Sequence, residues 1–243
     1  MSETTGAPDE CGVTPPPRLE APPVITPPPA VSPSFAGRSE PLDPWFSIWT
    51  RPRATLRQIL DDDPRRSVYR LAALGGIAGA LKLLTESGAG LTAPLAATLA
   101  VAVAGGALGG VLFLFLFTGL LRVAGRWLGG RGGTLEIRAA LAWANVPEIW
   151  GMILWLPRGA LLGEEMFQPV PSGIEGNPPA ALFFGLIVLA QTLVGFWGLV
   201  IGLKCIAEAH RFSAWRALGA LILVGLMLIV PVGLLMIAAQ ALS

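Results

Sequence analysis

The sequence predicts an all-α, polytopic membrane protein: a bundle of five transmembrane helices with a cytoplasmic-side amphipathic helical stretch and a disordered, proline-rich N-terminal tail. The 243 residues are 53% hydrophobic and only 14% charged, whereas soluble domains carry roughly 25% charged residues. Five apolar runs each exceed the roughly 10–14 residues expected of a helix buried in a soluble core. Half of the 22 prolines stand before residue 43, which marks off the tail from the rest of the chain.

Residues 1–42 are predicted to form a disordered cytoplasmic tail. They contain two PPP runs, at 15–17 and 27–29. A segment of this composition cannot bury enough apolar surface to offset the entropy lost on ordering, and consecutive prolines favour the polyproline II helix. A plain entropic tail is the favoured interpretation, and a ligand for an aromatic-grooved domain is the alternative.

The segment 43–66 is predicted to form juxtamembrane amphipathic helices. The first helix starts at Asp43 and Pro44, because a carboxylate caps the first turn and proline loses no hydrogen bond there. A second helix starts at Pro52 and ends in the acidic run that begins at Asp61.

Aromatic and basic side chains of this segment predict contact with lipid headgroups. Aromatic rings are enriched at membrane interfaces, and guanidinium groups meet anionic lipids there. The alternative is a solvated helical hairpin that packs on its own domain. The candidate interfacial residues are Trp45, Trp49, Arg51, Arg53 and Arg57.

Residues 67–243 are predicted to form the five-span membrane domain. The expected spans are residues 68–84, 93–121, 139–156, 180–203 and 217–239. The first is short for a hydrocarbon core about 30 Å thick. Arg70 and Lys82 stand near its two ends, where long basic side chains reach the interfaces.

Basic residues are distributed unequally between the two sides of the predicted membrane. The segment before span one and the loops after spans two and four carry thirteen, against two on the opposite side. The positive-inside rule then predicts a cytoplasmic N-terminus and an outside C-terminus. Arginine outnumbers lysine fifteen to two, which favours a GC-rich bacterial genome and hence the bacterial cytoplasmic (inner) membrane.

Small residues recur at four-residue spacing in several spans. In lipid, helix association depends on close packing, which glycine permits. The pattern predicts packing within the bundle, with a homo-oligomer through the same small-xxx-small faces as the alternative. The pairs are Gly75/Gly79, Gly105/Gly109, Gly106/Gly110 and Gly198/Gly202.

One acidic residue within a span is a candidate for chemistry. Glu148 lies in the third span, where an ionisable group is costly and is by default a functional hypothesis. Pro147 removes a helical N–H, so a kink is expected where Asn145 and Glu148 face a polar cavity. The candidate intramembrane polar site is therefore Asn145, Pro147 and Glu148, and the alternative is a protonated or arginine-paired acid. Gln191 and Thr192 are expected to form hydrogen bonds between helices.

Other chemistries find little support in the sequence. Cys205, Glu208 and His210 have no known metal-ligand spacing, and two cysteines are too few for a disulfide framework. The glycine-rich run 129–133 lacks the lysine and hydroxyl residue of a phosphate-binding loop. We therefore expect no catalytic residue, no metal, no cofactor and no nucleic-acid partner.

Four stretches resemble the bacterial branch of the Yip (Ypt-interacting protein) domain family: PWFSIWTRPRATLRQILDDDP at 44–64, LAWANVP at 141–147, GEEMF at 163–167 and IAEAHRFSAWRAL at 206–218. The resemblance runs from about Asp43 to the C-terminus. It implies five spans and a cytosolic N-terminus. Eukaryotic members of the family are linked to vesicle traffic, membrane curvature and the binding of prenylated small GTPases.

These observations predict an integral membrane scaffold or organising protein without catalytic activity. Its expected partners are the lipid bilayer and an unidentified membrane or cytoplasmic protein. The alternative is a small transporter or channel component that uses the polar site at Asn145 and Glu148. A transporter is expected to show internal repeats with paired broken helices, and the five unequal spans do not show them.

Overall fold

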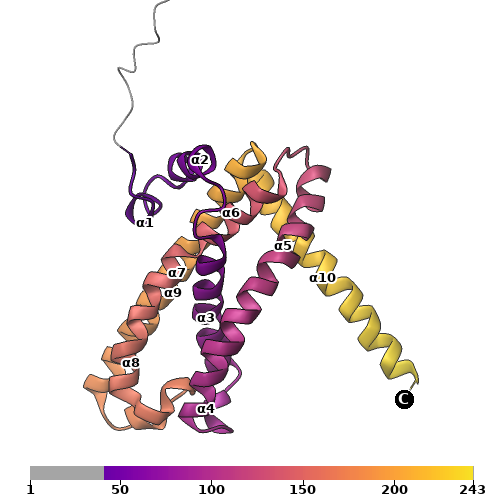
Figure 1. Cartoon of the computed structure of the whole chain (residues 1–243). Helices are drawn as coiled ribbons and strands as arrows, with labels where there is room; N and C mark the ends of the chain where they lie inside the picture. Colours follow the sequence, from indigo (N-terminus) through magenta and orange to yellow (C-terminus); the bar gives the residue numbers. More distant parts are fainter. Residues whose placement is uncertain (1–40, 243) are drawn as a thin grey trace, which may run out of the picture. The chain divides into compact units, whose positions relative to one another are not determined.

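The computed structural model describes residues 41–242, and this range contains helices and turns but no strand (Figure 1). Five of its helices are long and apolar enough to cross a membrane: Val68–Glu86, Leu95–Trp127, Thr134–Phe167, Pro178–His210 and Ala214–Leu234. The predicted all-α, five-span fold is confirmed. The proline-rich tail that the sequence predicts over residues 1–42 lies, apart from its last two residues, outside the described range.

Two short helices precede the first span. α1 covers Pro44–Ser47 and α2 covers Pro52–Asp62. Asp43 caps α1, because its Oδ1 accepts a hydrogen bond from the N–H of Trp45 at 3.0 Å. Both helices begin where the sequence predicts. α1 is a single turn, and Ile48 follows it as the C-terminal cap.

The five spans differ in continuity. The first, fourth and fifth are single helices: α3 (Val68–Glu86), α9 (Pro178–His210) and α10 (Ala214–Leu242). The second consists of α4 (Leu95–Ala100), a π-helical turn (Val101–Gly105) and α5 (Gly106–Trp127). The third consists of α6 (Thr134–Ala144), α7 (Val146–Gly151), a 3₁₀ turn (Met152–Leu154) and α8 (Trp155–Leu162). Further 3₁₀ turns cover Ala89–Leu91, Gly163–Phe167 and Ser172–Ile174.

The third span is broken at Asn145. Pro147 lies in the first turn of α7 and has no N–H, so α6 cannot continue through it with regular hydrogen bonds. The N–H of Asn145 donates to the carbonyl of Ala142 at 3.2 Å, and its carbonyl accepts from the N–H of Ile149 at 2.9 Å. The interruption expected at this proline is therefore present.

Glycines let α3 and α5 approach each other closely. A Cβ placed on Gly110 would lie 2.7 Å from the Cα of Gly76, and one placed on Gly106 would lie 2.8 Å from the Cβ of Ala80. A Cβ placed on Gly109 would have no neighbour within 4 Å. The small residues of the second span thus serve packing within the chain, through Gly106 and Gly110.

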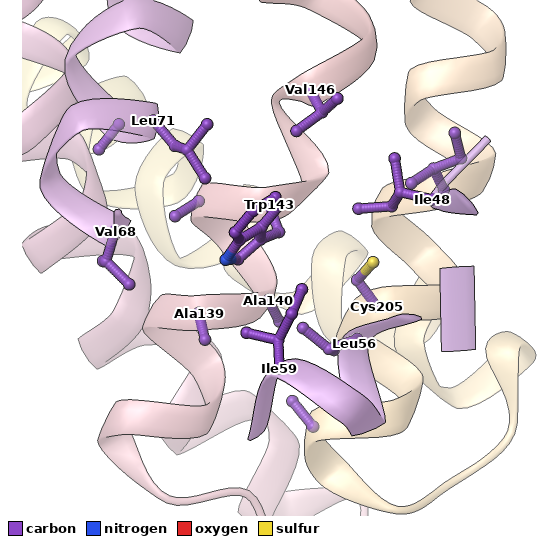
Figure 2. Packing of buried hydrophobic residues seen from close by; sticks show 14 of the residues in the cluster. Ile48, Leu56, Ile59, Val68, Leu71, Ala139, Ala140, Trp143, Val146 and Cys205 are labelled. Atoms are coloured by element: carbon purple, nitrogen blue, oxygen red, sulfur yellow. The ribbon is translucent and has the colours of Figure 1, made fainter. Parts of the chain in front are cut away.

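One core cluster joins the N-terminal helices to the membrane bundle (Figure 2). We call α1, α2 and the turn between them, residues 44–62, the cap. Ile48 and Leu56 of the cap are fully buried in the same cluster as Trp143 of α6 and Cys205 of α9. Residues of α3 and α7 complete this contact region: Val68, Leu71, Ala72 and Val146. A second cluster holds α10 against α5 and α9 through Leu121, Ile206 and Val224.

Candidate functional site

The break in the third span sets the position of Asn145 and Glu148. Because α7 restarts after Asn145, the Glu148 carboxylate is directed at a glycine-lined face of α9. A Cβ placed on Gly198 would lie 3.5 Å from Glu148 Oε1, and a Cβ placed on Gly195 would lie 3.4 Å from it. Both polar side chains are half-buried, while Pro147 is buried and forms the break. The candidate intramembrane site therefore faces α9.

Asn145 and Glu148 line cavities next to the break. Both residues line one of about 320 Å³ together with glycines of α9. Asn145 also lines a second, of about 560 Å³, whose walls come largely from α3 and α5. A Cβ on Gly75 would lie 2.7 Å from the Asn145 amide nitrogen. The glycine at this position of α3 thus makes room for the Asn145 side chain.

Two further polar residues, Lys82 and Gln191, line this site. Lys82 is exposed near the end of α3, and its Nζ lies 3.5 Å from the Cβ position of Gly195, a position that Glu148 Oε1 also approaches. The Nε2 atom of Gln191 is buried and has no hydrogen-bond partner in the described part of the chain. Lys82, Glu148 and Gln191 line a cavity of about 60 Å³. The sequence shows that these residues are polar and lie within spans. It does not show which neighbouring helix each side chain faces.

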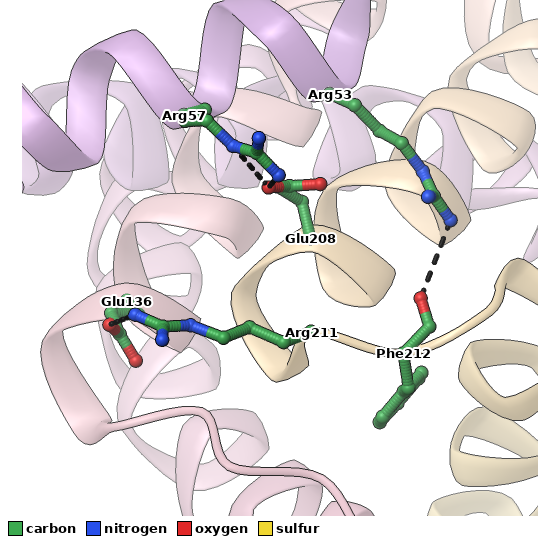
Figure 3. A network of polar contacts seen from close by, with 6 residues as sticks. All are labelled: Arg53, Arg57, Glu136, Glu208, Arg211 and Phe212. Atoms are coloured by element: carbon green, nitrogen blue, oxygen red, sulfur yellow. Dashed lines mark hydrogen bonds and ion pairs between the residues drawn. The ribbon is translucent and has the colours of Figure 1, made fainter.

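The cap is attached to the α9–α10 turn by arginines (Figure 3). Arg57 donates from Nε, at 2.8 Å, and from Nη2 to Oε1 of Glu208 on α9. The hydrogen bond and the negative charge of Glu208 raise the pKa of the Arg57 guanidinium above its ordinary value. Arg53 donates from Nη2 to the carbonyl of Phe212 at 3.4 Å. These two arginines therefore bind the protein itself.

The tryptophans of the cap also contact the bundle. The rings of Trp45 and Trp143 meet edge to face with centroids 6.1 Å apart. The carbonyl of Trp49 accepts a hydrogen bond from Nε1 of Trp197 on α9 at 3.1 Å. Arg51 is exposed. Contact of the five candidate interfacial residues with lipid remains a prediction, although four of them already contact the chain.

An amide clamp holds the start of the cap. Gln58 accepts from the N–H of Leu42 at 2.9 Å and donates to the carbonyl of the same residue at 3.1 Å. The side chain of Gln58 thus binds the backbone of Leu42 as a neighbouring strand would.

His210 explains the glycine-rich run between α5 and α6. It is 1% exposed, and its ring stacks on Phe212 with centroids 5.0 Å apart. Cβ atoms on Gly130 or Gly132 would lie 2.7 or 2.9 Å from its Nδ1. Glycines are needed here because the α5–α6 turn wraps around the imidazole.

Across residues 41–242 no three metal-ligating side chains come together. Cys205, near His210 in sequence, lies in the core.

Comparison with known proteins gives one finding for this chain. The Yip1 domain matches residues 46–236, which include the cap from Phe46 onward, the broken third span and most of α10. No curated protein and no solved structure matches the chain.

Proposed function

The chain belongs to the Yip1 domain family of membrane proteins, and from this premise we propose that it organises other membrane components without catalysing a reaction. The multi-pass architecture agrees with such a role. We place the protein in the bacterial inner membrane with its N-terminus in the cytoplasm and its C-terminus outside. The excess of basic residues on one side of the spans supports this orientation.

The observation that carries the proposal is the docked cap. Ile48 and Leu56 are fully buried, and Arg57 is tied to Glu208. The cap is therefore a fixed surface at the end of the bundle, in contrast to a loose arm. Its outer face presents exposed residues such as Ala54. A fixed surface beside the membrane suits the binding of a cytoplasmic or membrane partner, because little ordering entropy is lost on contact.

Site-directed photo-crosslinking in intact cells tests this role. A photoreactive residue at Ala54 is expected to give discrete protein adducts. The matched control is Val170, which is 78% exposed and lies between the third and fourth spans. We expect no adduct there, and we expect the Ala54 adduct to weaken in Glu208→Gln, which removes the carboxylate that Arg57 binds. Equal adducts at both positions, or none at Ala54, would contradict a partner site on the cap.

A transporter or channel component is the second candidate function. It is favoured by Asn145, which lines both the 320 Å³ and the 560 Å³ cavities beside the break in span three. In proteoliposomes carrying a pH-sensitive dye, a transporter of this kind is expected to pass protons or small cations. The flux should disappear in Glu148→Gln. If vesicles with the wild-type protein leak protons no faster than protein-free vesicles, proton transport is excluded as this candidate's function.

A further inference from the structure

Lys82 and Glu148 approach the same glycine of α9, Lys82 from an exposed position and Glu148 from a half-buried one. Gly195 stands near the middle of α9, whose 33 residues are longer than the hydrocarbon core requires. Lys82 Nζ and Glu148 Oε1 lie 3.5 and 3.4 Å from the Cβ position of this glycine. An isolated charge at such depth is strongly unfavourable, so each group requires a compensating partner.

The two charged groups are close to each other without direct contact. Within residues 41–242 no ion pair joins Lys82 to Glu148, although both line the same cavity of about 60 Å³. A water molecule needs roughly 10–15 Å³ of such space and two to four polar partners. The cavity therefore has room for a few waters, and the ammonium and carboxylate supply partners for them.

Gln191 supplies independent support for bound water. Its Nε2 is buried without a partner in the described structure, and a buried amide donor left unpaired is unfavourable. Because Gln191 lines the same cavity, water there would accept its hydrogen bond. Water in this cavity would therefore serve both the amide and the separated charges.

We infer that Lys82, Glu148 and Gln191 form a hydrated site inside the membrane domain, in which bound water bridges the ammonium and the carboxylate. The same water accepts the hydrogen bond of the Gln191 amide. This site is independent of the cap.

A double-mutant cycle in the full-length protein tests the coupling. In phosphatidylethanolamine–phosphatidylglycerol nanodiscs, Lys82→Gln and Glu148→Gln are each expected to lower the Tm by about 6 °C, since each leaves one charge without its partner. The double variant should recover most of that loss. The control pairs Glu148→Gln with Lys204→Gln, which removes the other lysine of the chain, and its effects should add. Additive effects for Lys82 and Glu148 would overturn the site.

Nuclear magnetic resonance of lysine tests the hydration. In Lys204→Arg protein labelled with ¹⁵N-lysine, the single Nζ signal belongs to Lys82, because the chain has two lysines. Magnetisation transfer from water to this nitrogen is expected, and it should fall in Gln191→Leu. Coupling in the mutant cycle with no transfer from water would mean a dry ion pair and would also overturn the proposal.

Discussion

Individual glycines in this protein differ in what surrounds them, even when they are neighbours in sequence. Gly110 lies against the α3 backbone, while Gly109 lies in open space. Both belong to four-residue pairs, so spacing alone does not distinguish them. Spacing also does not explain Gly132, where a side chain would collide with His210. The contacts of each glycine depend on how its helix is rotated against its neighbour.

Alanine substitutions at these two neighbours should therefore have opposite effects. Gly110→Ala places a Cβ 2.7 Å from the Cα of Gly76, and such overpacking costs about 1–3 kcal/mol. Gly109→Ala meets no atom within 4 Å and is expected to be neutral or to stabilise by up to about 1 kcal/mol through helix propensity. Thermal unfolding in nanodiscs measures both. Equal stability of the two variants would show that α3 and α5 are not in close contact at Gly110.

At the scale of helices, the cap is the element whose contacts matter most for the proposed function. The sequence predicts its helix starts, because Asp43, Pro44 and Pro52 act locally. It also predicts the break in span three, since Pro147 lacks an N–H. It does not predict that Arg57 reaches Glu208, because they are 151 residues apart and only the folded bundle brings them together. For the same reason it does not predict that Lys82 and Glu148 line one cavity.

Docking of the cap can be measured with single cysteines. Ile59 is 3% exposed, so Ile59→Cys should resist a membrane-impermeant thiol reagent added to inverted vesicles. Ala54→Cys, on the exposed face of α2, is the matched control and should react. Trp45→Ser with Trp49→Ser is expected to release the cap and make Ile59→Cys reactive, because these rings pack against the core cluster. Rapid labelling of Ile59→Cys in the otherwise unchanged protein would mean that the cap is not docked.

At the scale of the whole molecule, the span count could be predicted because apolar runs and charged loops alternate along the chain. The interruptions within spans were less predictable. The π-helical turn at Val101–Gly105 has no proline to announce it, whereas the break at Asn145 has Pro147. A proline that breaks a helix can be recognised in the sequence. The contacts with other helices that stabilise a π-helical turn cannot.

Membrane topology gives the test at this scale. With five spans and the basic segments on one side, an alkaline phosphatase fusion after Ser243 is expected to be active and a green fluorescent protein fusion there to be dark. The reverse pair of results is expected for fusions at Gly130, in the loop between the second and third spans. A bright fluorescent fusion at the C-terminus would require an even number of spans.

The amide clamp between Gln58 and Leu42 has a mechanical consequence. Because the chain enters the cap through two hydrogen bonds to α2, tension applied to the N-terminal segment is carried by α2 before it reaches α1. From α2 the load passes through Arg57 to Glu208 and so to the end of α9. A pull on the N-terminus is therefore shared between the backbone that leads from α2 into the first span and the side-chain link to the fourth span.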